Sequence, residues 1–197
     1  VQGGVVLSLE RMNHILAVRP DDRLLIAQPG VTNGAVQAAA AQHGFFWPPD
    51  PTSSAYASIG GNVACNSAGP RAVKYGTTRD NVLGLTAVTG TGELIRCGSY
   101  TTKGVVGYDL TRLLIGSEGT LAVITEVVLK LTPQPAQVRT VRAMYADVHA
   151  AARAVACIMA QPHTPCAVEL LDGASLNMIR HHTSLDLPTN VGAVLML

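Results

Sequence analysis

The sequence predicts an α+β fold. Short apolar runs of strand length recur before Pro133, with few helical patterns between them. After Pro135 the pattern changes to a β-α-β-α-β order, which is typical of a second α+β unit. Hydrophobic residues make up 48% of the 197 residues and charged residues 14%, as in compact globular chains.

The first elements are predicted to be strands followed by one helix. The strand-like runs are Val5–Leu9, His14–Val18 and Leu24–Gln28. The turn at Pro20-Asp21-Asp22 separates the second and third runs. An alanine-rich helix over Ala35–Gln42 follows, since Thr32 or Asn33 can cap its start and Gly44 lies past its end.

A long irregular stretch, Phe46 to Thr78, is expected next because it is dense in Pro, Gly, Ser and Asn. Two strands joined by a Thr-Gly-Thr-Gly turn are then predicted, over Val82–Thr89 and Glu93–Cys97. A short helix over Tyr108–Ile115 should place three leucines, Leu110, Leu113 and Leu114, on one side. The long apolar run Leu121–Leu131 predicts a final strand of this unit.

The sequence Pro133-Gln134-Pro135 is interpreted as a domain boundary, dividing the chain into residues 1–135 and 136–197. Beyond it, the elements predicted in order are a strand, an amphipathic helix, a strand, a helix and a last strand: Val138–Tyr145, Val148–Ala160, Val168–Leu171, Gly173–His181 and Ala193–Leu197. Both ends of the chain lie in apolar runs, so we expect it to be a segment of a longer protein.

Charge and cysteine patterns exclude several classes of function. The net charge is +1 without a basic stripe, which excludes nucleic acid as a partner. No apolar run reaches the roughly 18 residues of a membrane span. The cysteines are scattered without metal-ligand spacing, which favours reduced, mostly buried thiols, a cytoplasmic setting and no metal site. They are Cys65, Cys97, Cys157 and Cys166.

The first motif that could carry chemistry runs from Pro48 to Gly69. Its prolines favour an extended path, and its glycines allow backbone to approach a ligand closely. Ser, Thr and Asn side chains together with free backbone N–H groups can bind phosphate oxygens without a cation. From composition alone, a glycine-rich surface loop explains this stretch equally well.

The second motif is Gly116-Ser117-Glu118-Gly119-Thr120, placed between the short helix and the last long strand. A carboxylate between two glycines can accept a hydrogen bond from a ribose or ring hydroxyl, and the strand backbone can contact an adenine edge. The alternative is an ordinary helix end and turn with a solvated Glu118.

Together the two motifs resemble the PCMH-type FAD-binding domain of the vanillyl-alcohol oxidase flavoproteins. Within that superfamily the likeness is greatest to the FAD-linked subunits of bacterial glycolate oxidases and to D-lactate and D-2-hydroxyglutarate dehydrogenases. The supporting strings also include Arg11–Leu16, Gln28–Val31, Lys74-Tyr75-Gly76 and Gly107-Tyr108-Asp109-Leu110. The resemblance implies a PCMH-type domain that lacks its N-terminal subdomain and is followed by the start of an α+β cap domain.

The resemblance also implies FAD as cofactor and roles for particular residues. Those implied to lie along the flavin and pyrophosphate are Pro51, Thr52 and Ser53. Those implied to surround the pyrophosphate and flavin edge, largely through backbone, are Ser58, Ile59, Gly60, Gly61, Asn62, Ala64 and Asn66. Glu118 and Gly119 would lie near the ribose, and the main chain of Ile124 near adenine. The family's catalytic and metal-binding side chains fall outside this chain, so no catalytic residue is assigned.

The function implied is FAD-dependent oxidation of a small 2-hydroxy acid, such as glycolate or D-lactate, to the 2-oxo acid. Hydride would pass to flavin N5 and electrons to a further acceptor, with other subunits of an oxidase complex as partners and the inner face of the membrane reached through them. Two alternatives stay open: a non-catalytic FAD-binding subunit of such a complex, and a superfamily oxidase of another alcohol.

Overall fold

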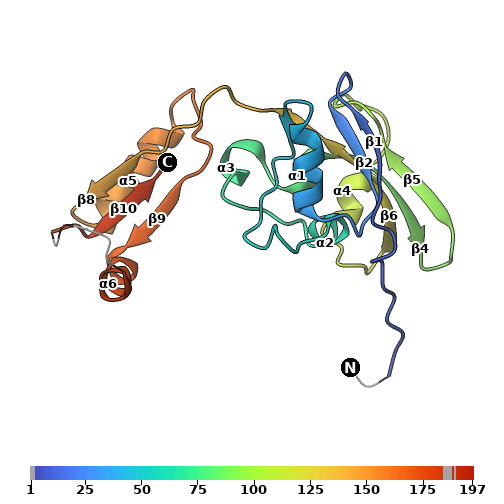
Figure 1. The fold of residues 1–197 in the computed structure, drawn as a ribbon, viewed down its shortest axis with the longest axis horizontal. Coiled ribbons are helices and arrows are strands. Elements are labelled where there is room, and N and C mark those ends of the chain that lie inside the picture. Colours follow the sequence, from blue (N-terminus) through green and yellow to red (C-terminus); the bar gives the residue numbers. More distant parts are fainter. Residues whose placement is uncertain (1–2, 184–187, 189) are drawn as a thin grey trace. The chain divides into compact units, whose positions relative to one another are not determined.

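The computed structural model describes residues 3–183, 188 and 190–197. Figure 1 shows its helices and strands along the chain. The strands are β1 (Ile15–Arg19), β2 (Leu24–Ala27), β3 (Phe45–Phe46), β4 (Val82–Thr89), β5 (Leu94–Gly98), β6 (Ala122–Lys130), β7 (Thr132–Pro133), β8 (Arg142–Tyr145), β9 (Glu169–Asp172) and β10 (Ala193–Met196). The helices are α1 (Asn33–Ala41), α2 (Ile59–Ala64), α3 (Ala72–Tyr75), the 3₁₀ helix η1 (Thr78–Asn81), α4 (Leu110–Leu114), α5 (Val148–Met159) and α6 (Gly173–His182).

The chain divides into two compact units. One comprises residues 1–69 and 75–134, and the other comprises residues 70–74 and 135–197. Both combine helices with antiparallel sheet, as the α+β prediction requires.

The first unit is built on a five-stranded sheet in the order β1-β2-β6-β4-β5, in which all neighbours are antiparallel. One face of the sheet forms the main core with residues of α1, α2 and α4. Figure 1 shows α1 lying alongside β1 and β2. Trp47 is fully buried in this core, and its indole N–H donates to the carbonyl oxygen of Asn81 at 3.0 Å. The indole thereby links the segment after β3 to the start of β4.

The opposite face of this sheet carries a smaller apolar cluster of Leu24, Ile26 and Val128. Alternation along β2 explains the two clusters, because Leu25 and Ala27 face the main core while their neighbours face away from it. The loop after β5 returns toward β1, and the Arg19 guanidinium lies 5.7 Å from the centre of the Tyr100 ring.

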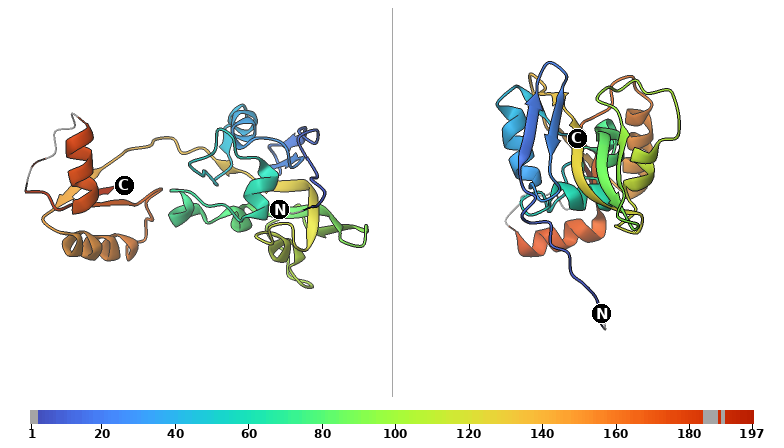
Figure 2. Two further views of the ribbon diagram at one scale, coloured as in Figure 1. Left: turned by 90° about the horizontal axis from the view of Figure 1, so that it is seen from below. Right: turned by 90° about the vertical axis from the view of Figure 1, so that its right-hand side faces the viewer.

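The second unit is a three-stranded antiparallel sheet in the order β8-β10-β9. Successive residues of β10 face opposite sides, so Ala193 and Leu195 pack with Ala151 of α5, and Val194 packs with Leu176 of α6. Figure 2 shows this unit from two further directions. The two helices therefore bury the two faces of one central strand.

Three sequence predictions about this architecture are wrong. Val5–Leu9 forms no strand, and Val5 and Val6 are 97% and 96% exposed. An apolar run becomes a strand only when another strand satisfies its backbone, and none of the described residues pairs with this one. The stretch from Phe46 to Thr78 is not wholly irregular, because it contains α2 and α3.

The predicted short helix is present as α4, in which Leu110 and Leu113 are exposed and Leu114 is buried. The third wrong prediction concerns the thiols. Of the four cysteines, Cys97 is half-buried and the other three are exposed, which contradicts the expectation of mostly buried thiols.

Candidate functional site

The start of α2 packs against the turn before α1. Ser58 caps α2, since its side-chain oxygen accepts the N–H of Gly61 at 3.1 Å. The N–H of Ile59 donates to the carbonyl of Val31, and that of Gly60 to the carbonyl of Pro29, both at 2.8 Å. Because these two N–H groups already donate within the chain, a ligand at the start of α2 would have to bind other donors.

Such donors exist in the turn that precedes α2. Thr52 and Ser53 are exposed, and their backbone N–H groups donate to no other residue that the structure describes. The carbonyl of Ser53 accepts the N–H groups of Tyr56 and Ala57, at 2.9 and 2.8 Å, which fixes the turn. Two hydroxyls and two unpaired amides thus lie on one exposed turn.

The two predicted motifs lie together, although about fifty residues separate them along the chain. The N–H of Gly116 donates to the carbonyl of Val63, and the N–H of Glu118 donates to that of Ala64, both at 3.0 Å. The turn that carries Glu118 and Gly119 is therefore hydrogen-bonded to the C-terminal end of α2.

Asn66 and Glu118 both adopt left-handed backbone, with φ of 50° and 51°. This conformation costs a non-glycine residue about 1 kcal/mol or more unless the surroundings hold it. At Asn66 the side-chain oxygen accepts the N–H of Arg79 at 2.9 Å. At Glu118 the hydrogen bond from its backbone N–H to the carbonyl of Ala64 holds the left-handed conformation.

The sequence interpretation missed η1 as a member of this site. Thr78 is fully buried, and both its N–H and its hydroxyl donate to the carbonyl of Ser67, at 3.0 and 2.9 Å. Arg79 donates from a terminal guanidinium nitrogen to the carbonyl of Ile115 at 2.7 Å. The Thr-Thr-Arg-Asp-Asn string at 77–81 was the available signal, because Thr77 followed three residues later by Asp80 favours a capped helical turn.

Ile124 lies in the middle of β6 and is 8% exposed, so only its main chain can meet a ligand. On one side it pairs with Ala87 of β4. On the other side β2 pairs only with Val127–Lys130, and no described strand pairs with residues 122–126 there. Backbone groups on that edge of β6 are available to a planar ligand.

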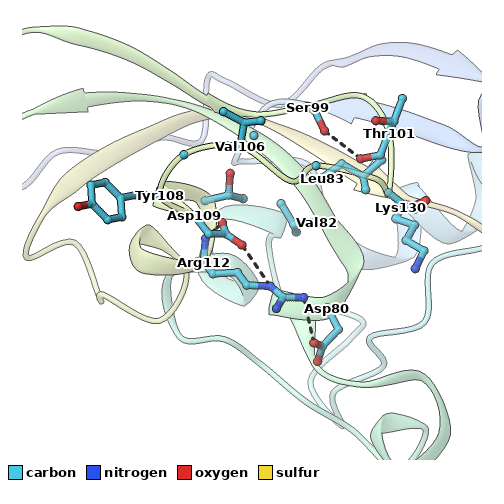
Figure 3. A pocket seen from close by; sticks show the side chains of 15 residues that line it. Asp80, Val82, Leu83, Ser99, Thr101, Val106, Tyr108, Asp109, Arg112 and Lys130 are labelled. Carbon is cyan, nitrogen blue, oxygen red and sulfur yellow. Dashed lines mark hydrogen bonds and ion pairs between the residues drawn. The ribbon is translucent and has the colours of Figure 1, made fainter.

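One cavity lies elsewhere in the first unit. It measures 410 Å³ and is lined by the loop after β5, by α4 and by parts of η1, β4 and β6. Figure 3 shows Arg112 between Asp80 and Asp109, with N–O distances of 3.7 and 3.5 Å, and Lys130 at the far side. A second cavity of 320 Å³ is lined by β4, β5 and the start of the same loop. None of the residues predicted to bind FAD lines either cavity.

The described residues contain no group of three or more His, Cys, Asp and Glu side chains that could hold a metal ion. None of the helices in those residues is long and apolar enough to cross a bilayer. What the geometry offers at the two motifs is hydroxyls and backbone N–H groups, which are groups that bind phosphate oxygens.

Comparison with known proteins decides which family this surface belongs to. Residues 1–98 match the family described as FAD binding domain, and residues 134–197 match FAD linked oxidases, C-terminal domain. The glycolate oxidase subunit GlcD of Bacillus subtilis is 43% identical over 196 residues, which are 100% of this chain and 42% of that protein. The chain carries the FAD binding domain found in FAD-linked oxidases.

Two further relatives are similar to about two thirds of the chain. D-lactate dehydrogenase of Anaerostipes hadrus is 45% identical over 70% of the chain and 29% of that protein. D-2-hydroxyglutarate dehydrogenase of Xanthomonas citri pv. viticola is 45% identical over 68% of the chain and 28% of that protein. The chain thus spans less than half the length of these relatives.

A solved structure of alkyldihydroxyacetonephosphate synthase shares the fold. Its TM-score is 0.76 at 23% identity, covering 95% of this chain and 36% of that one. This likeness shows the α+β fold, and the match of residues 1–98 to the FAD binding domain agrees with a PCMH-type domain.

The residues present fit FAD. The turn at Thr52 and Ser53 offers donors to pyrophosphate oxygens, and the exposed carboxylate of Glu118 can accept a ribose hydroxyl. Asn62 is 2% exposed, and its buried Nδ2 has no partner among the described residues, so the end of α2 keeps an unused donor. Polar groups of these types match the polar parts of this cofactor.

Proposed function

We propose that the protein containing this chain oxidises a small 2-hydroxy acid, such as glycolate or D-lactate, to the 2-oxo acid. Support comes from the relatives, because glycolate oxidase GlcD matches the whole chain and D-lactate dehydrogenase matches 70% of it. For the cofactor site, the observation that carries the proposal is the pair of hydrogen bonds that joins Val63 and Ala64 to the Gly116–Glu118 turn.

The chain's residues would hold the cofactor in two clusters. In the first, Thr52 and Ser53 donate to the pyrophosphate, while Ser58 keeps α2 capped. The other members of this cluster contribute carbonyl and Cα surface: Pro51, Ile59, Gly60, Gly61, Asn62, Ala64 and Asn66. In the second, Glu118 and Gly119 contact the ribose, and the free edge of β6 at Ile124 contacts adenine.

Bound FAD supplies a hydride acceptor at flavin N5. Such an acceptor would take the Cα hydrogen of the hydroxy acid as hydride, and a base would take the hydroxyl proton as the carbonyl forms. The role of the present residues is to bind and orient; no residue of this chain is assigned as that base. Residues 1–135 would form the FAD-binding domain, and 136–197 would belong to the substrate domain.

Partners are proposed on the same basis. The relative from Bacillus subtilis is named as a subunit of glycolate oxidase, so we expect further subunits to receive the electrons.

The test uses the full-length protein that contains this chain. We expect it to purify with bound flavin, and its visible flavin absorption to bleach when glycolate or D-lactate is added without oxygen. Bleaching only with an alcohol that lacks the carboxylate would overturn the substrate class. A flavin that no substrate reduces would indicate a non-catalytic subunit.

A further inference from the structure

Arg79 forms hydrogen bonds at both clusters of the proposed cofactor site, with Asn66 of the first and with the residue before the second. Its backbone N–H donates to the side-chain oxygen of Asn66 at 2.9 Å. Its guanidinium Nη2 donates to the carbonyl of Ile115 at 2.7 Å. The first contact reaches the end of α2, and the second reaches the residue before the Gly116–Gly119 turn.

The contact with the turn is close. Gly116 has φ of 83°, and a Cβ atom there would lie 3.0 Å from Arg79 Nη2 and 3.2 Å from the Cβ of Asn66. Gly116, Asn66 and Arg79 therefore meet at one point. A side chain at Gly116 would therefore crowd both Arg79 and Asn66.

The arginine keeps this geometry at an energetic cost. Its Nε–H is buried and has no partner among the residues that the structure describes. An unpaired buried donor normally destabilises a fold, so something else must favour this orientation. The short bond to the carbonyl of Ile115, from a charged donor, is the favourable contact that the structure shows.

We propose that Arg79 is a positioning residue for FAD: it holds the Gly116–Gly119 turn against the end of α2 and so sets the distance between the two cofactor-binding clusters. This inference rests on the cofactor contacts proposed above, although Arg79 itself touches no cofactor atom in it. Because Glu118 and Gly119 serve the ribose side, loss of the guanidinium weakens contacts to the adenosine half of FAD and spares those to the flavin half.

The experiment compares Arg79→Gln with Arg112→Gln in the full-length protein. Arg112 is a suitable control because it belongs to neighbouring α4 and pairs with Asp80 and Asp109, but contacts neither cluster. Dissociation constants for FAD and for FMN, which lacks the adenosine half, are measured by flavin fluorescence on apoprotein. The melting temperature of each apoprotein is measured alongside.

We expect R79Q to raise the dissociation constant for FAD about tenfold, because a turn that the guanidinium no longer holds loses part of its contact with the ribose. The constant for FMN should change little, and the apoprotein should melt within a few degrees of R112Q. Arg79→Lys should recover part of the FAD affinity, since it restores the charge but not the planar fork.

Equal losses for FAD and FMN, together with a lower melting temperature, would overturn the inference in favour of a purely structural role. Unchanged FAD binding in R79Q would overturn it as well. Glu118→Gln separates this failure from failure of the proposed site. If E118Q weakens FAD binding and R79Q does not, only the role of Arg79 is wrong; if neither does, the assignment of the Glu118 turn to the cofactor is wrong.

Discussion

At the scale of single residues, Gly60 of the first motif is required for packing as well as being a predicted cofactor contact. Gly60 has no room for a side chain, since a Cβ would lie 2.6 Å from the Cβ of Pro29. Its absence of a side chain lets α2 pack directly on the turn before α1, which also places the Gly60 N–H on the carbonyl of Pro29. The motif predicts that Gly60 contacts the ligand, and the structure shows that a glycine is also needed there for α2 to pack on Pro29.

Gly60→Ala should therefore destabilise the protein by about 1–3 kcal/mol, as overpacked sites do. Gly34→Ala is the matched control, because a Cβ at that helical glycine meets nothing within 4 Å. The control should be neutral or more stable by up to about 1 kcal/mol. Denaturant unfolding measures both, and a G60A protein as stable as G34A would contradict the packing argument.

At the scale of elements, the two helices of the second unit begin at aspartates. Asp147 accepts the N–H of Ala150 at 2.7 Å, and Asp172 accepts that of Ser175 at 2.8 Å. These backbone bonds favour the charged form and hold the pKa of each carboxyl below its ordinary value. Stability from a lowered pKa is present above the ordinary carboxyl range and is lost as the pH falls through the folded-state value.

Asp147→Ala should thus lower the melting temperature at neutral pH, and the difference from the wild type should shrink as the pH falls below about 4. Asp147→Asn keeps an acceptor that does not titrate, so it should stay close to the wild type at neutral pH. Thermal melts across a pH series measure this. A deficit in D147A that is the same at every pH would show that the charge of the cap does not matter.

At the scale of the whole molecule, the proposed FAD contacts form an open surface. Thr52, Ser53 and Glu118 are exposed, and neither cavity of the first unit includes them. Binding sites for molecules of this size usually enclose most of the ligand. The 197-residue chain alone should therefore bind FAD more weakly than micromolar, while the full-length protein retains it. Fluorescence titration of the isolated chain tests this, and a micromolar constant would contradict it.

The sequence by itself determined the elements whose signal is local. The strand over Val82–Thr89 was predicted with its observed bounds, and the cap at Thr32 and the helices after Pro135 were predicted within a few residues. Alternation, capping residues and turn residues act between near neighbours, so a one-dimensional pattern is enough. The family resemblance that the two motifs support also implied FAD as the cofactor, as the family matches confirm.

Only the tertiary structure decided what joins those motifs. The bonds from Gly116 and Glu118 to α2, and the contact of Arg79 with Ile115, connect residues tens of positions apart. Whether such residues meet depends on the path of β4, β5 and α4 between them, and no local pattern encodes that path. The same reason explains Val5–Leu9, whose apolar run is suited to a strand but whose conformation depends on a partner elsewhere.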